Sequence, residues 1–141
     1  MDMIIERFKR YIAIDTKSDE NSNTCPSTKG QLELGALVVE ELKDLGLKDV
    51  KQDESGYVYA TLKSNIDKKV PTIGFISHFD TSPDLDGKCI NPQIFIYEGG
   101  DIKTGGYNFH GRFEFIPTKS MKLASKLIVK IAENNTRSLD K

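Results

Sequence analysis

Cysteine and histidine are scarce in this 141-residue sequence, and long apolar runs do not occur in it. The two cysteines, Cys25 and Cys89, have no spacing typical of a metal site, so we expect them to stay reduced thiols in a reducing cytosol. No apolar stretch approaches the roughly 18 residues that a membrane span requires. Charged residues interrupt the first ten positions, which excludes the apolar core of a signal peptide. The sequence therefore predicts a cytoplasmic protein without a membrane partner.

An excess of either charge is also lacking, since 20 basic residues face 21 acidic ones and the formal net charge is -1. Lysines alternate with acids, as at Lys43-Asp44 and Lys48-Asp49, so no basic stripe forms that would follow a phosphate backbone. Nucleic acid is not an expected partner. The length suits one domain with a core and is too short for two such domains.

Helical periodicity is present in three stretches. Apolar residues recur at spacings of three and four, which predicts amphipathic helices over residues 3–14, 31–45 and 120–133. Gly46 offers a stop for the second helix. The third helix has an apolar stripe made of Met121, Ala124, Leu127, Ile128 and Ile131.

Strand-forming residues lie between the second and third helices. Residues 50–62 read as a hairpin that turns at Glu54-Ser55-Gly56. Residues 72–77 are short and apolar, as in a strand buried on both faces, and a further short strand is possible at 93–97. Helices around a small mixed sheet predict the α/β class.

The first histidine follows the predicted buried strand, in His78-Phe79-Asp80. Functional groups collect at the carboxyl ends of strands in α/β sheets, and a neutral imidazole there can bind zinc. Asp80 would lie on the same side and could orient the ring. Taken alone, the short motif favours the alternative reading, a hydrogen-bonded loop histidine and a turn aspartate.

The second histidine, His110, lies between the glycine pair at 105–106 and a β-like stretch at 113–116. Glycines at 105, 106 and 111 allow the backbone to approach a metal or a substrate closely. A surface histidine in a glycine-rich connection is the alternative reading.

Other candidate chemistry is weak. The carboxylates of Glu40 and Glu41 diverge around a helix, which favours a solvated face over an acid–base pair. The glycines at 99–106 lack the spacing of a phosphate-binding loop. No nucleophilic serine in an elbow motif is evident.

Taken together, these segments resemble the tripeptide aminopeptidases of the M20 metallopeptidase family. The stretch Gly-Phe-Ile-Ser-His-Phe-Asp-Thr at 74–81 is similar to the family's first metal motif, and residues 105–115 are similar to its last one. The likeness continues in the same order over residues 5–11, 14–18, 26–31, 39–42, 91–94 and 118–133.

The resemblance also implies a departure, because two ends of such an enzyme are joined near Lys103. A single truncated catalytic-type domain is expected, with an N-terminal segment at 1–103 and a C-terminal segment at 104–141. It would be a reduced version of the zinc-dependent exopeptidase catalytic domain. The missing middle would hold the bridging aspartate, the glutamate base, two carboxylate ligands and a smaller domain associated with dimer formation.

Carried over by motif, His78 would bind one of two zinc ions, His110 would bind the other, and Asp80 would be the catalytic-site residue that orients the first. The implied function is release of the N-terminal residue of a tripeptide. Some carboxylates could substitute for the missing ligands only because they lie near the two histidine motifs in the sequence. They are Asp84, Asp86, Glu98, Asp101 and Glu114.

Two hypotheses remain open at this point. The chain is either an impaired metal-dependent aminopeptidase that binds short peptides, or a non-catalytic remnant or interaction module with weak metal binding. Uncovered sheet edges or apolar surface would favour a homo-oligomer in either case.

Overall fold

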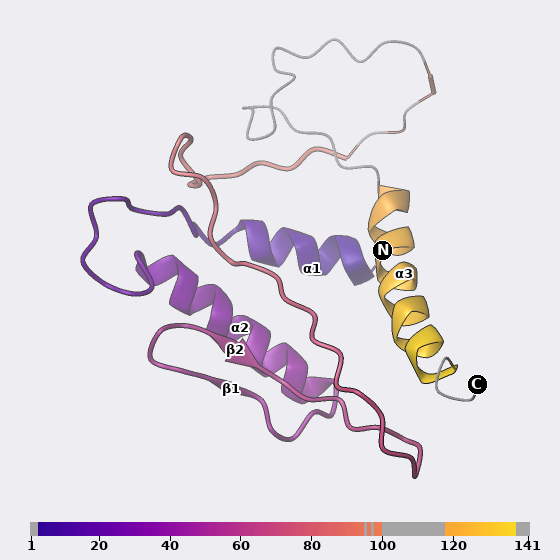
Figure 1. Ribbon diagram of the computed structural model, residues 1–141. Helices are drawn as coiled ribbons and strands as arrows, with labels where there is room; N and C mark the ends of the chain where they lie inside the picture. Colours follow the sequence, from indigo (N-terminus) through magenta and orange to yellow (C-terminus); the bar gives the residue numbers. More distant parts are fainter. Residues whose placement is uncertain (1–2, 95, 97, 100–117, 138–141) are drawn as a thin grey trace.

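The computed structural model describes residues 3–94, 96, 98–99 and 118–137. In chain order it contains α1 (Met3–Ile12), α2 (Lys29–Asp44), β1 (Lys51–Gln52), β2 (Val58–Tyr59) and α3 (Thr118–Arg137). Figure 1 shows α1 and α2 on one side of the molecule, the hairpin against α2, and α3 at the far end of α1. The expected α/β class with helices around a small sheet is confirmed.

The helix α2 forms the centre of the fold. Its buried face consists of Gln31, Leu34, Gly35 and Val39. The helix ends as predicted at Gly46, whose φ of 90° places it in the left-handed region that favours glycine. The amides of Gly46 and Leu47 then bond back to the carbonyls of Lys43 and Leu42, at 2.8 and 3.2 Å, which satisfies two of the helix's terminal carbonyl groups.

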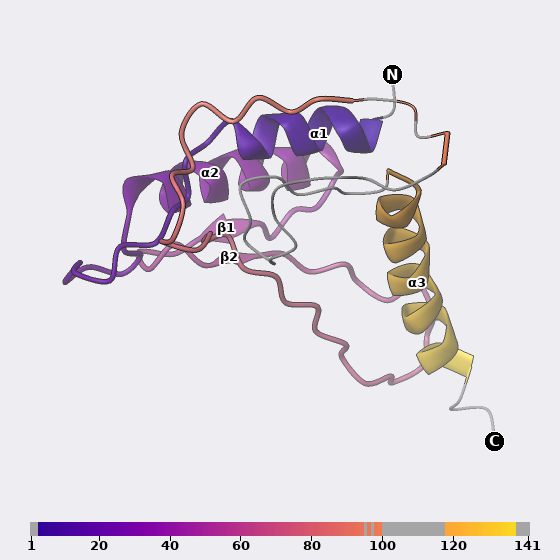
Figure 2. The ribbon, with the colours of Figure 1, turned by 90° about the horizontal axis from the view of Figure 1, so that it is seen from above.

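The predicted hairpin is confirmed, and it packs on α2. Lys51 pairs with Tyr59 and Gln52 with Val58 in an antiparallel register. The side chain of Gln52 donates to the carbonyl of Leu32 at 3.1 Å, and a Cβ added at Gly35 would lie only 2.2 Å from Gln52 Nε2. Glycine at position 35 therefore lets the hairpin approach the helix closely, as Figure 2 shows from above.

The turn of the hairpin is organised by Asp53. Its Oδ1 accepts the amides of Ser55 and Tyr57, at 3.0 and 2.9 Å. Gly56 has a φ of 84°, and its amide bonds to the carbonyl of Asp53 at 3.0 Å. Aspartate and glycine are typical of such turns because one accepts backbone amides and the other tolerates positive φ.

The helices α1 and α2 are joined through Glu41. Arg10 and Tyr11 of α1 donate hydrogen bonds to its two oxygens, the second at 2.7 Å. Arg7 Nε lies 2.8 Å from Glu41 Oε2 as an ion pair without hydrogen-bond geometry. The expected solvated face is therefore right for Glu40, which pairs only locally with Lys43, and wrong for Glu41, whose side chain is 13% exposed.

The expected buried strand at 72–77 is wrong. None of these residues is assigned to a strand, and Phe75 and Ile76 are 53% and 99% exposed. A strand needs a neighbouring backbone, and among the described residues nothing pairs with this segment. The possible strand at 93–97 is not formed at residues 93, 94 and 96, while residues 95 and 97 lie outside the described part.

The predicted third helix is confirmed as α3, which contacts α1. Its apolar stripe remains largely exposed, with Leu127, Ile128 and Ile131 at 61%, 46% and 40%. Within the described ranges, no helix combines the length and the apolar character needed to cross a membrane.

Candidate functional site

The ring of His78 is fixed by Asp80. Its Nδ1 lies 2.8 Å from the backbone carbonyl oxygen of Asp80 and 3.1 Å from the carboxylate Oδ1. Both partners accept hydrogen bonds, so in the neutral ring the proton is assigned to Nδ1. The lone pair is then on Nε2, and the side chain is 82% exposed. Among the described residues Nε2 has no hydrogen-bond partner, so its lone pair is available to a metal or another electrophile.

The carboxylate of Asp80 is itself held by the N-terminal loop. Its Oδ2 accepts the hydroxyl of Ser18 at 3.1 Å, and the same hydroxyl donates to the carbonyl of Thr81 at 3.0 Å. The backbones of the two segments also pair, since Ser18 N bonds to Thr81 O at 3.0 Å and Thr81 N bonds to Thr16 O at 3.2 Å. These contacts form an isolated parallel bridge between Lys17 and Thr81.

Buried polar side chains at the start of α2 hold the loop that forms this bridge. Gln31, at the start of α2, donates through Nε2 to the carbonyl of Thr16 at 3.3 Å and to Ser27 Oγ at 3.1 Å. Thr28, which precedes α2, uses its hydroxyl for the carbonyl of Lys17 at 3.0 Å rather than as a helix cap. Thr16 and Gln31 are 4% and 7% exposed. The helix start therefore fixes the loop, and the loop fixes Asp80.

Two glycines permit the close packing around Asp15 in this loop. A Cβ at Gly30 would lie 1.7 Å from the backbone oxygen of Asp15, and a Cβ at Gly87 would lie 2.4 Å from its Oδ1. Both distances are far below van der Waals contact. The loop, the start of α2 and the segment after Thr81 consequently meet only if these positions lack side chains.

An open hollow of about 570 Å³ borders the bridge. Its lining is largely polar and includes four acidic residues; it consists of Asp15, Lys17, Ser18, Asp19, Glu20, Asn21, Thr28, Pro83 and Asp84. The sequence pattern around Ser18 did not indicate this residue as the partner of Asp80. The only indication was that residues 14–18 form one of the segments that resemble the family.

The residues described here do not make a complete metal centre. Among them, no group of three or more histidine, cysteine, aspartate or glutamate side chains is placed to hold an ion. Asp84 accepts the hydroxyl of Ser82 at 2.7 Å, and Asp86 accepts the amide of Lys88 at 3.4 Å, so both serve local turns. His110, Asp101 and Glu114 lie outside the described residues. The described part of the chain thus offers His78, paired with the carboxylate of Asp80, and no converging set of further ligands.

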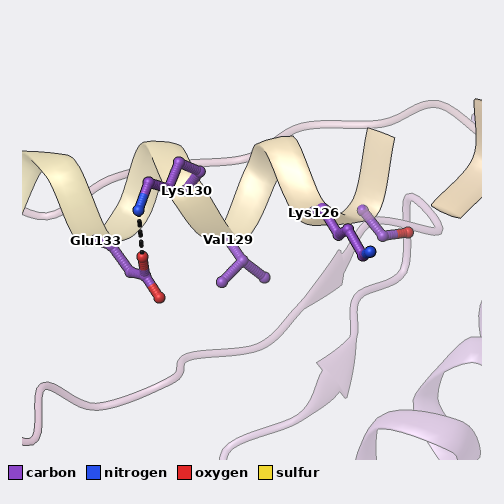
Figure 3. Close-up of a pocket in the computed structure, with 5 residues that line it drawn as sticks. Lys126, Val129, Lys130 and Glu133 are labelled. Atoms are coloured by element: carbon purple, nitrogen blue, oxygen red, sulfur yellow. Dashed lines mark hydrogen bonds and ion pairs between the residues drawn. The ribbon is translucent and has the colours of Figure 1, made fainter. Parts of the chain in front are cut away.

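A second hollow, of about 310 Å³, lies along α3 (Figure 3). One helix supplies all of its lining, which includes Val129 and the ion pair between Lys130 Nζ and Glu133 Oε2 at 3.3 Å. It shares no residue with the hollow near His78. Nothing in it converges on a reacting atom.

Comparison with known proteins gives one consistent result. The chain is 59% identical over 105 residues to peptidase T of Shouchella clausii, which is 74% of this chain and 26% of that protein. It is 54% identical over 115 residues to peptidase T of Clostridium perfringens, and 64% identical over 100 residues to peptidase T of Clostridium botulinum, covering 80% and 70% of this chain. No family model matches the chain.

The resemblance is therefore confirmed at the level of peptidase T, and it applies to the matched stretch. This chain spans about a quarter of the length of those relatives, and a fifth or more of the chain lies outside each match. The junction of two enzyme ends near Lys103 and the division at 103–104 stay predictions.

Proposed function

We propose that this chain, similar to peptidase T over most of its length, contributes part of the metal site of an M20-type tripeptide aminopeptidase. The observation that carries the proposal is the pairing of His78 with Asp80. One ring nitrogen is held by a carboxylate, and the other is exposed. Metal-binding histidines in proteins are oriented in this way by a carboxylate or a carbonyl on their second nitrogen.

In this proposal each residue has a defined role. His78 would bind a zinc ion through Nε2, and Asp80 would keep the ring in the required tautomer. His110 would bind the second zinc ion, and this role rests only on the match of residues 105–115 to the family's last metal motif. Zinc, when bound, supplies an activated water for attack on a peptide carbonyl.

The short peptide expected as substrate would reach the site from the open, polar side. The side chain of His78 is exposed, and Ser18, which holds Asp80, also lines the hollow with its four acidic residues. A cationic peptide amino terminus would be attracted by Asp19, Glu20 and Asp84. The cytoplasmic location and homo-oligomeric state expected from the sequence remain part of this proposal.

The incomplete ligand set favours low activity in the isolated chain. A catalytic zinc site usually has three protein ligands and one open position, whereas the described residues place one. This observation also supports the second candidate function, a non-catalytic remnant with weak metal binding.

The two candidates are separated by assaying tripeptide hydrolysis with added zinc, cobalt or manganese. We expect slow, metal-dependent turnover that His78→Ala abolishes. Asp67→Asn, which removes an exposed carboxylate outside the pairing and outside the possible substitute ligands, is the matched control and should retain turnover. If a sample with normal helix content shows no turnover, the aminopeptidase function is excluded and the chain is a non-catalytic remnant.

Metal binding is measured separately by titration calorimetry. His78→Ala should lose binding whether or not the chain is active, while Asp67→Asn should keep it. Unchanged affinity in His78→Ala would show that His78 is not a ligand, and would overturn both versions of the proposal.

A further inference from the structure

The segment at residues 71–77 combines apolar side chains with an unpaired backbone. Ile73, Phe75 and Ile76 are 36%, 53% and 99% exposed. Within the described part of the chain, no backbone hydrogen bond involves residues 71–77, and Figure 1 draws them as coil. Unpaired amides and carbonyls beside β-forming apolar residues are the features that recruit another strand.

The segment is complementary to itself in one antiparallel register. If Gly74 of one copy faces Gly74 of a second copy, Ile73 faces Phe75 and Thr72 faces Ile76. Aromatic and β-branched residues directly opposite each other are among the favourable cross-strand pairs. The register creates the Ile73–Phe75 pair twice, once on each side of the centre.

The hydrogen-bond pattern of this register also suits the proline. When the two Gly74 residues form a hydrogen-bonded pair, the pairs of Thr72 with Ile76 are hydrogen-bonded too, and Pro71 falls opposite Ser77 at a non-hydrogen-bonded pair. The missing N–H of Pro71 then points away from the second copy. Proline is tolerated in a strand at such positions.

Charge on either side of the segment agrees with the same register. Two lysines, Lys68 and Lys69, precede it, and Asp80 follows it. Antiparallel pairing around Gly74 places Lys68 of one copy opposite Asp80 of the other. A parallel, in-register arrangement would instead place the like charges together.

We propose that two copies of this chain associate by antiparallel pairing of residues 71–77, centred on Gly74. The occupant of the unpaired segment is thus a second copy of the same segment. Interfaces below about 1,200 Å² are typical of weak or transient complexes, and a seven-residue pairing is short. The dimer is therefore expected to dissociate on dilution. This proposal does not depend on metal binding or catalysis.

The register is tested by charge swapping at its centre. A Cβ at Gly74 would meet no atom within 4 Å in the single chain, so substitution there leaves the monomer unstrained. Gly74→Lys and Gly74→Glu each place like charges opposite each other and should raise the dissociation constant several-fold, about 5-fold for a strong cross-strand pair. An equimolar mixture of the two variants should recover the dimer.

Sedimentation equilibrium over a wide concentration range measures each dissociation constant. Ala60→Lys and Ala60→Glu add the same charges at an exposed position outside the segment and should change little. Circular dichroism must show unchanged helix content in every variant. A wild-type monomer at all concentrations, or a mixture that associates no better than either variant alone, would overturn the proposal.

Strand direction is tested with one double variant. Thr72→Lys combined with Ile76→Glu places opposite charges together only in the antiparallel arrangement, so association should strengthen. Weaker association than in the wild-type chain would indicate parallel pairing and contradict the proposed geometry.

Discussion

Tyr11 of α1 donates a hydrogen bond of 2.7 Å to Glu41 of α2, across 30 positions of sequence. The same carboxylate accepts a hydrogen bond from Arg10 and lies in an ion pair with Arg7. Three side chains of α1 thus converge on one residue of α2. Because α1 has no buried residue of its own, this polar contact is a main link between the two helices.

Replacing Glu41 should weaken that link. We expect Glu41→Gln to lower the free energy of unfolding by about 1–3 kcal/mol, the usual range for losing hydrogen bonds to a charged group. Urea denaturation followed by circular dichroism measures the loss. Glu40→Gln is the control, since its exposed pair with Lys43 is worth at most about 0.5 kcal/mol.

The effect of Glu41 should also depend on pH. Burial raises the pKa of Glu41, but hydrogen bonds from Arg10 and Tyr11 and the charge of Arg7 outweigh it, so its pKa lies below the ordinary value of 4.5. The carboxylate therefore stabilises the fold above pH 4.5, and this contribution is lost as the pH falls through the lowered pKa. An equal difference between wild type and Glu41→Gln at pH 7 and in strong acid would contradict this.

Tyr11 should resist ionisation. Burial, together with the hydrogen bond to Glu41 and its charge, raises the pKa of Tyr11 from 10.0 to about 12. The neutral hydroxyl therefore stabilises the fold fully below pH 10, and this contribution is lost as the pH rises toward 12. Ultraviolet titration should show a tyrosine that ionises near pH 12 in the wild-type chain. This transition should be missing in Tyr11→Phe. If the tyrosine lost in Tyr11→Phe is one that titrates near pH 10, the raised pKa of Tyr11 is disproved.

Gly30 should not tolerate a methyl group. A Cβ there would lie 1.7 Å from the backbone oxygen of Asp15, so Gly30→Ala must push the loop away from α2. Overpacking of this kind costs about 1–3 kcal/mol. Gly74→Ala, at an open position, should cost nothing and can be slightly stabilising. Thermal unfolding of both variants checks the contrast, and equal melting temperatures would refute it.

His78 should carry its neutral-form proton on Nδ1. The nitrogen-15 shifts of the ring report the tautomer directly. Asp80→Ala removes the carboxylate, while the backbone carbonyl at 2.8 Å remains, so the preference should fall without vanishing. A net hydrogen bond of about 0.5–1.5 kcal/mol corresponds to a change of roughly 2- to 12-fold in the tautomer ratio. A proton on Nε2 in the wild-type chain would exclude the proposed role in metal binding.

Local pattern was sufficient to predict the elements that depend on local interactions. The helices follow from apolar spacing, the end of α2 follows from Gly46, and the hairpin follows from the turn at Asp53–Gly56. In each case the partners are close in sequence. The pairing of His78 with Asp80 belongs to the same group, because the two residues are only two positions apart.

Features that need distant partners could not be predicted from the sequence. The apolar run at 72–77 predicts a buried strand, but burial depends on a neighbouring strand that the described chain does not provide. Glu41 looks like a solvated carboxylate because its partners lie 30 positions away. Ser18 looks like a loop serine because Asp80 lies 62 positions away.

The bridge between Lys17 and Thr81 has a consequence for the order of folding. It closes a loop of more than sixty residues, which costs about 3–4 kcal/mol in chain entropy before any contact compensates for it. The helix α2 and its hairpin involve much shorter loops and can form earlier. Asp80 consequently forms its contact with Ser18 only after this long loop has closed. The carboxylate that orients the ring of His78 is therefore fixed only late in folding.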